Sequence, residues 1–169
     1  MLILLSPSKT QETGHQYKEQ SSPEFKKKTE LLVRSLQQLS ALEIQKLMQI
    51  SEKLAESTRQ RFANFPASQQ GANSCQALLA FRGDVFSEIE VEHYTSDDFT
   101  FAQKHLRILS GLYGTLRPLD LIKPYRLEMG GKFKPPGAKN LYEFWRQDIT
   151  AALQQTCESD RHRELLNLA

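Results

Sequence analysis

Glycine, proline and cationic residues are dense between residues 106 and 129, the stretch of this sequence best suited to chemistry. Gly111 and Gly114 enclose a Leu-Tyr pair, so the chain can turn tightly there and present backbone N–H groups without large side chains in the way. Arg117, Lys123 and Arg126 follow and supply positive charge. Bare N–H groups beside cationic side chains are typical of a cradle for an anion, above all a phosphate.

Positive charge is concentrated in the same part of the chain. Residues 101–147 hold nine Lys or Arg and three acidic residues, a net charge of +6, although the formal charge of the whole 169-residue chain is only +2. A local excess of this kind attracts phosphates without making the whole protein basic. The alternative is an ordinary solvated surface, because charges that are close in sequence need not be close after folding.

Three interpretations of the glycine-rich segment stay open. In the first, residues 109–116 form the hairpin of a helix-hairpin-helix element whose glycine N–H groups hold a DNA phosphate and grip the backbone without reading its sequence. In the second, an arginine binds an oxyanion or phosphate and a carboxylate or phenol moves a proton; the residues of this active site would be Lys9, Tyr125, Arg126 and Glu128. In the third, the glycines and prolines only make turns and the tyrosines belong to the core.

Lys9 is brought to such a site by the predicted fold. Leu2–Leu5 is an apolar run that stops at Ser-Pro-Ser, as a buried central strand does where it enters a loop. Lys9 then lies just past the carboxyl end of that strand. In open α/β sheets this is the position where ligands bind.

Hydrophobic periodicity predicts helices and further strands along the rest of the chain. Helices are expected to begin at the capping residues Ser21, Ser40, Ser51, Ser96 and Asn140, with Lys26–Lys28 as a solvated face of the first. Short apolar runs predict strands at Ala77–Phe81 and Leu165–Ala169, whereas Leu106–Leu109 fits either a strand or an extension of the preceding helix. The order of elements predicts one domain, residues 1–169, of the α/β or α+β class, with a mixed central sheet flanked by helices.

Composition excludes several classes of protein. With 39% hydrophobic and 25% charged residues, the chain is typical of globular proteins rather than disordered ones. The apolar run at residues 2–5 is too short for a signal peptide or a membrane span, so we expect a cytoplasmic protein without membrane partners. Cys75 and Cys157 match no metal or redox spacing and the four histidines are scattered, so neither a metal nor a cofactor is expected.

Six short segments give the chain a distinctive pattern, in this order: Leu4–Thr10, Ala80–Val85, Ser110–Gly114, Leu116–Asp120, Pro124–Gly130 and Asn140–Trp145. Together they resemble the YaaA peroxide-stress family. The resemblance implies a cytosolic bacterial protein of the oxidative-stress response that limits peroxide and iron damage to DNA. It also implies a distinctive α/β fold with a helix-hairpin-helix-like DNA-binding element beside a basic cleft, and no established catalytic reaction.

The matching segments assign candidate residues. With Lys123 added from the local charge, the expected DNA contacts are Lys9, Gly111, Leu112, Tyr113, Gly114, Arg117, Lys123 and Arg126. Tyr125 and Glu128 also match, and they complete the alternative active site. The chain departs from the family pattern at Gln11-Glu12 and at Leu166–Ala169, where relatives continue, so the domain is expected to be incomplete at its carboxyl end.

The leading functional hypothesis is a DNA-protective stress protein that binds mainly the phosphate backbone. An enzyme of unknown reaction on a phosphorylated or nucleic-acid substrate is the alternative, and a non-catalytic scaffold is the third. A pure binder should tolerate the loss of the Glu128 carboxylate, because that charge repels phosphate, whereas an enzyme that uses it should not.

Overall fold

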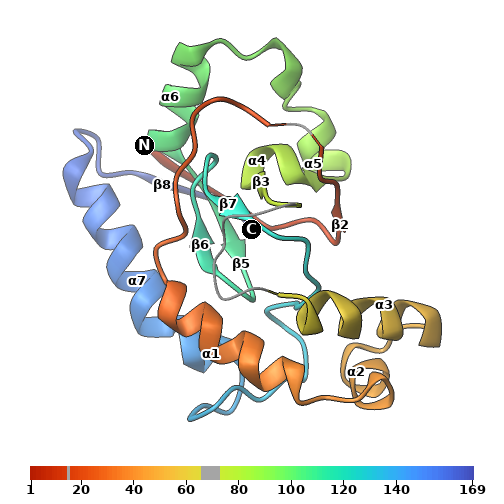
Figure 1. The fold of residues 1–169 in the computed structure, drawn as a ribbon. Helices are drawn as coiled ribbons and strands as arrows, with labels where there is room; N and C mark the ends of the chain where they lie inside the picture. Colours follow the sequence, from red (N-terminus) through yellow and green to blue (C-terminus); the bar gives the residue numbers. More distant parts are fainter. Residues whose placement is uncertain (15, 66–72) are drawn as a thin grey trace.

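The chain folds around a four-stranded sheet with the strand order β6-β5-β1-β8 (Figure 1). The computed structural model describes residues 1–14, 16–65 and 73–169. The strands of this sheet are β1 (Leu2–Leu5), β5 (Leu106–Ser110), β6 (Gly114–Leu116) and β8 (Leu165–Leu168). β1 pairs in parallel with β5 and β8, and β6 returns antiparallel beside β5. The predicted α/β class with a mixed central sheet is confirmed.

The interior position of β1 follows from its sequence. Leu2, Leu4 and Leu5 are buried, as expected for a strand with a neighbour on each side. Pro7 ends the strand's pairing because proline has no N–H to donate to the ladder. Since β1, β5 and β8 are parallel, their carboxyl ends meet at one edge of the sheet, and the loop that carries Lys9 leaves from this edge.

Two short ladders anchor the loops around the sheet. β2 (Thr10–Gln11) pairs antiparallel with β4 (Phe81–Arg82), and β3 (Cys75–Gln76) pairs antiparallel with β7 (Leu121–Ile122). Because β2 begins directly after Lys9, its pairing with β4 fixes the far end of the loop that carries this lysine.

The described helices surround the sheet and its loops (Figure 1). They are α1 (Lys26–Gln37), α2 (Ala41–Met48), α3 (Glu52–Ala63), α4 (Ala77–Ala80), α5 (Asp84–Ser87), the 3₁₀ helix η1 (Val91–His93), α6 (Ser96–His105) and α7 (Leu141–Ser159). Ser40, Ser51 and Asn140 accept backbone N–H groups as N-caps, as predicted. In α6 the cap is Thr95, which forms a capping box with Asp98, so the expected start was one residue off.

The capping box expected at Ser21 does not form. α1 begins at Lys26, after an N-cap at Phe25 whose side chain makes no capping hydrogen bond. Ser21 instead donates its hydroxyl to Asp120 Oδ1 at 2.6 Å, and its backbone pairs with the chain around Asp120. The local pattern predicted that Ser21 caps the helix, but its side chain bonds a residue distant in sequence instead.

The strand expected at Ala77–Phe81 is a turn of helix, α4, between the short strands β3 and β4. Its first amide groups pair outside the helix: Ala77 N–H donates to Asp120 and Leu78 N–H to Pro118. All four α4 residues are buried, so their apolar character reflects burial rather than a strand. By contrast, residues 106–109 form a strand, which settles the alternative that periodicity left open.

The core joins α1 and α7 to the β5–β6 hairpin. Trp145 of α7 is buried, donates Nε1–H to the carbonyl of Gly111 at 2.9 Å and packs against the ring of Phe25. Lys28 of α1 forms an ion pair with Asp148 of α7 and lies over the ring of Phe144. Lys28 is therefore a bridge between two helices, and the prediction of a purely solvated face was wrong for this residue.

β8 forms where a strand was predicted, but its side chains are not buried. Leu165, Leu166 and Leu168 are exposed on this strand, which pairs with β1 alone among the described residues. Cys75 and Cys157 form no disulfide. Within the described ranges, no helix combines the length and apolar character needed to cross a membrane.

Candidate functional site

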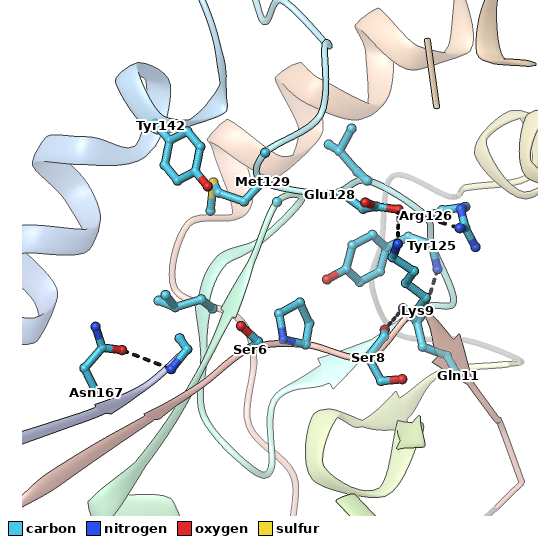
Figure 2. A pocket seen from close by; sticks show the side chains of 16 residues that line it. Ser6, Ser8, Lys9, Gln11, Tyr125, Arg126, Glu128, Met129, Tyr142 and Asn167 are labelled. Atoms are coloured by element: carbon cyan, nitrogen blue, oxygen red, sulfur yellow. Dashed lines mark hydrogen bonds and ion pairs between the residues drawn. The ribbon is translucent and has the colours of Figure 1, made fainter. Parts of the chain in front are cut away.

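Three charged side chains from two loops meet at the sheet edge where the parallel strands end. Lys9 Nζ lies 3.1 Å from Glu128 Oε1, and Arg126 Nη2 lies 3.6 Å from the same oxygen. Figure 2 shows Lys9 reaching up from the loop after β1 toward Glu128, with Arg126 beside them. The structure thus brings together three of the four residues named for the alternative active site, whose activity stays a prediction.

This cluster borders a cavity of about 380 Å³. The cavity is lined by Ser6, Pro7, Ser8, Lys9, Gln11, Leu109, Gly111, Tyr125, Arg126, Leu127, Glu128, Met129, Gly130, Tyr142, Asn167 and Ala169. In Figure 2 the charged cluster stands on one side, and Tyr142 of α7 and Asn167 of β8 stand on the other. Part of the lining, which includes Ser6, Leu109 and Asn167, comes from the carboxyl ends of β1, β5 and β8, where ligands bind in open α/β sheets.

Tyr125 is part of the cavity's floor. Its hydroxyl lies 2.7 Å from Ser110 Oγ, and its backbone N–H donates to the side-chain oxygen of Gln11 at 2.8 Å. Burial raises the pKa of the Tyr125 phenol far above its usual value, despite the opposing effect of its hydrogen bond to Ser110. Tyr125 thus stays protonated at neutral pH and positions the segment that carries Arg126 and Glu128.

A second cavity of about 250 Å³ lies on the other side of the same segment. It is lined by Leu47, Met48, Gln49, Arg126, Leu127, Glu128, Gly130, Gly131, Lys132 and Phe133. Arg126 and Glu128 therefore border both spaces. Arg126 Nε is buried, and among the described residues no hydrogen-bond partner reaches it.

Gly111 lines the cavity, but the rest of the glycine turn, Leu112 to Gly114, does not. Residues 106–116 form a β-hairpin, β5–β6, so the helix-hairpin-helix expectation is wrong for this segment. The N–H groups of Leu112 and Tyr113 already donate to Ser110 Oγ, and both side chains are fully buried. These N–H groups therefore have acceptors within the protein and are not available to a phosphate.

The two glycines serve packing. Gly114 has a φ of +78°, and a Cβ there would meet Phe25 and Trp145 at 2.9–3.0 Å. Gly111 lies against Leu127, whose carbonyl oxygen would be 2.3 Å from an added Cβ. The close approach inferred from sequence is real, but the approaching groups are the protein's own side chains and backbone.

Arg117 and Lys123 lie away from the cluster. Arg117 lines a separate hollow of about 610 Å³ at the opposite edge of the sheet, with Met1, Leu2 and Arg107. Lys123 lines another hollow, of about 510 Å³, with Pro124, and burial lowers the pKa of its amine. The nine basic residues between 101 and 147 are therefore not one patch.

Sequence reasoning missed several cavity residues. Asn167 could have been found, because it lies on a predicted strand parallel to β1 and thus at the same sheet edge. Tyr142 gave no such signal: it falls between the buried positions Leu141 and Phe144 of an ordinary amphipathic helix. Tyr142 is 60% exposed and lines the cavity.

The chemistry available here is anion binding. Lys9 and Arg126 share one carboxylate oxygen, so the cluster keeps an excess positive charge. No group of three His, Cys, Asp or Glu residues that could hold a metal ion occurs in the part of the chain that the structure describes.

Comparison with known proteins extends over the whole sequence. A family model described as peroxide stress protein YaaA matches residues 1–169. A UPF0246 protein of Acaryochloris marina is 51% identical over 173 residues, covering 100% of this chain and 67% of that protein. A UPF0246 protein of Ralstonia nicotianae is 44% identical over 171 residues, covering 100% of this chain and 66% of that protein. The chain thus spans about two thirds of the length of these curated relatives.

Proposed function

The chain belongs to the peroxide stress protein YaaA family, and from this premise we propose that it acts in the peroxide stress response by binding DNA in the cytoplasm and protecting it from peroxide and iron damage. The binding is to the phosphate backbone and does not depend on base sequence.

The observation that carries this proposal is a lysine-rich segment at the cavity. Met129 and Tyr142 both line the cavity, and residues 129–139 between them contain three lysines and no acidic residue. These lysines are Lys132, Lys134 and Lys139, and all three are exposed. Exposed lysines contribute directly to the attraction of a polyanion.

Two further residues extend this surface. Lys9 is exposed at the cavity, and the exposed ring of Tyr142 at the rim is available to stack on an unpaired base. The proposed DNA-binding surface therefore consists of Lys9, Lys132, Lys134, Lys139 and Tyr142, with Arg126 behind it. It replaces the buried hairpin as the place where DNA is bound.

The test is the salt dependence of duplex binding, measured by fluorescence anisotropy with a labelled duplex. The wild-type log affinity should fall linearly with log salt. Replacing Lys132, Lys134 and Lys139 together with Gln should weaken binding and flatten the slope by about 2–3 units, because each lost phosphate contact contributes about 0.9.

The matched control removes the same charge elsewhere. Lys26, Lys27 and Lys53 are exposed on α1 and α3 and line neither cavity. Their triple Gln variant should keep a slope close to wild type. Equal flattening in both variants would mean that DNA responds only to net charge, and an affinity independent of salt would refute the phosphate mode.

A further inference from the structure

The Glu128 carboxylate occupies a position that suits a ligand's anionic group. One oxygen, Oε1, is the common partner of Lys9 Nζ at 3.1 Å and Arg126 Nη2 at 3.6 Å. Two cations directed at a single oxygen form a binding position for an oxyanion. Glu128 is itself partly exposed and lies on a loop without helix or strand pairing, so it can move away from this position.

Arg126 has a donor left over. Its side chain is mostly buried, yet Nε has no hydrogen-bond partner among the described residues. A buried charged donor without an acceptor is costly, and such groups in folded proteins usually have a bound partner. The guanidinium therefore has more hydrogen-bonding capacity than Glu128 uses.

The space beside the cluster suits a small molecule. Its volume of about 380 Å³ falls within the roughly 300–1,000 Å³ typical of small-molecule sites. Leu109, Leu127 and Met129 supply apolar walls, and the hydroxyl-bearing Ser6 and Ser8 line the side next to Lys9. A ligand with one anionic end and a less polar body matches this division.

We propose that this cavity binds a free phosphate monoester, whose phosphate replaces the Glu128 carboxylate between Lys9 and Arg126. A phosphate monoester fits better than a carboxylate because its three terminal oxygens can serve two cations and a serine hydroxyl together, whereas a carboxylate has two. The body of the ligand lies against the apolar walls. This site shares Lys9 and Arg126 with the proposed DNA-binding surface but does not include Lys132, Lys134 or Lys139, so the triple lysine variant distinguishes the failure of one proposal from the failure of the other.

The exchange with Glu128 gives the proposal its sharpest test. Isothermal titration calorimetry would use inorganic phosphate, a nucleoside 5′-monophosphate and the same nucleoside without its phosphate. The monophosphate should bind and the nucleoside should not. Glu128→Gln should tighten monophosphate binding by about two- to fivefold, because it frees two cations from an exposed ion pair. Arg126→Gln should weaken binding by about tenfold or more.

Controls separate the alternatives. Lys9→Gln, an exposed change that leaves the core intact, should also weaken binding and covers the case in which Arg126→Gln fails to fold. Lys27→Gln removes a distant positive charge and should have no effect. The Lys132, Lys134 and Lys139 triple variant should keep monophosphate binding while its duplex affinity falls.

Three results would overturn the proposal. One is the absence of monophosphate binding to wild type and Glu128→Gln alike. Another is weaker binding by Glu128→Gln, which would make the carboxylate a ligand contact instead of a competitor. The third is duplex DNA that competes fully for Lys9 and Arg126 while the free monophosphate does not bind, which would assign the cluster to the DNA backbone.

Discussion

At the scale of single residues, two arginines of the same basic segment have opposite surroundings. Arg117 donates its backbone N–H and its guanidinium to Asp120, and a further guanidinium N–H to the Ser22 carbonyl. Arg126 contacts Glu128 at 3.6 Å, and its Nε has no hydrogen-bond partner among the residues that the structure describes. Arg117 is therefore a structural residue and Arg126 is available to a ligand. The residue type alone could not separate them, because the separation depends on where Asp120 lies.

Replacing Arg117 with Ala should destabilise the fold without altering DNA binding. Asp120 is 1% exposed, and the change removes its cationic partner. Breaking a buried ion pair costs about 3–5 kcal/mol. Because the Arg117 side chain is 37% exposed and water screens its charge, we expect a loss of about 2–3 kcal/mol in the free energy of unfolding. Urea unfolding measures it.

A second substitution tests the cause. Asp120→Asn in the Arg117→Ala background should recover part of the loss, since it removes the unpaired buried charge. Lys104→Ala, a change of the same charge at an exposed position beside the same hollow, should stay within about 0.5 kcal/mol of wild type. If Arg117→Ala proves as stable as Lys104→Ala, or flattens the salt slope of DNA binding, then Arg117 is a surface contact after all.

At the scale of elements, local signals were reliable where the partner group was nearby in the chain. The caps at Ser40, Ser51 and Asn140 were found because each bonds a backbone N–H three residues on. β1 was found because Leu2–Leu5 is apolar throughout. The cap predicted at Ser21 was wrong because the partner of this side chain, Asp120, is distant in sequence, and local sequence rules do not reveal such a partner.

The β5–β6 hairpin shows the same limit at the candidate site. The sequence indicated that something approaches Gly111 closely, which is correct, but it could not say that the approaching group is the backbone of Leu127. The same contact places residues 125–128 beside β5 and so helps to form the cavity. The convergence of Lys9, Arg126 and Glu128 was predictable as a hypothesis, whereas the apolar walls and Tyr142 required the fold.

Gly111→Ala should therefore be a folding mutation. An added Cβ would be 2.3 Å from the Leu127 carbonyl oxygen, and backbone cannot move aside as a flexible side chain can. We expect a loss of about 3 kcal/mol or more, at the upper end of overpacking costs. Thermal or urea unfolding followed by circular dichroism measures it.

Gly137→Ala is the matched control. Gly137, unlike Gly111, has a positive φ, +77°, and apart from its chain neighbours no atom of the described residues lies within 4 Å of its Cβ position. Only the backbone strain of a left-handed residue remains, about 1–2 kcal/mol. If the two variants lose equal stability, steric contact at Gly111 is not the cause. If Gly111→Ala folds normally and loses only DNA binding, the phosphate cradle is restored as an explanation.

At the scale of the whole molecule, function depends on how the fold redistributes charge. The +6 segment is divided between the cavity cluster, the hollow that contains Arg117 and the hollow that contains Lys123. The cavity in turn collects residues from the first loop, the central hairpin and the two last described elements, α7 and β8. Charge that is contiguous in sequence is dispersed, and residues that are remote in sequence are gathered.

The same fold buries two tyrosine phenols. As a result, the free energy of unfolding should depend on pH in the alkaline range. Burial raises the pKa of both Tyr113 and Tyr125 above the ordinary value of 10. Below about pH 10 both are neutral in the folded and unfolded chain, so their burial adds no pH dependence. Above about pH 10 the unfolded chain releases protons that the folded chain retains. The free energy of unfolding should then fall by up to about 1.4 kcal/mol per pH unit for each tyrosine.

Urea unfolding of wild type, Tyr125→Phe and Tyr142→Phe at pH 8, 10 and 11 would test this dependence. At pH 8, Tyr125→Phe should lose about 1 kcal/mol with the hydrogen bond to Ser110, whose Oγ still accepts two backbone N–H groups. Above pH 10 its stability should decline less steeply than that of wild type, so that the two curves converge. Tyr142→Phe changes an exposed ring and should follow the wild-type slope. Parallel curves for Tyr125→Phe and wild type would mean that water reaches the Tyr125 hydroxyl, and the cavity floor would then be open rather than closed beneath Arg126 and Glu128.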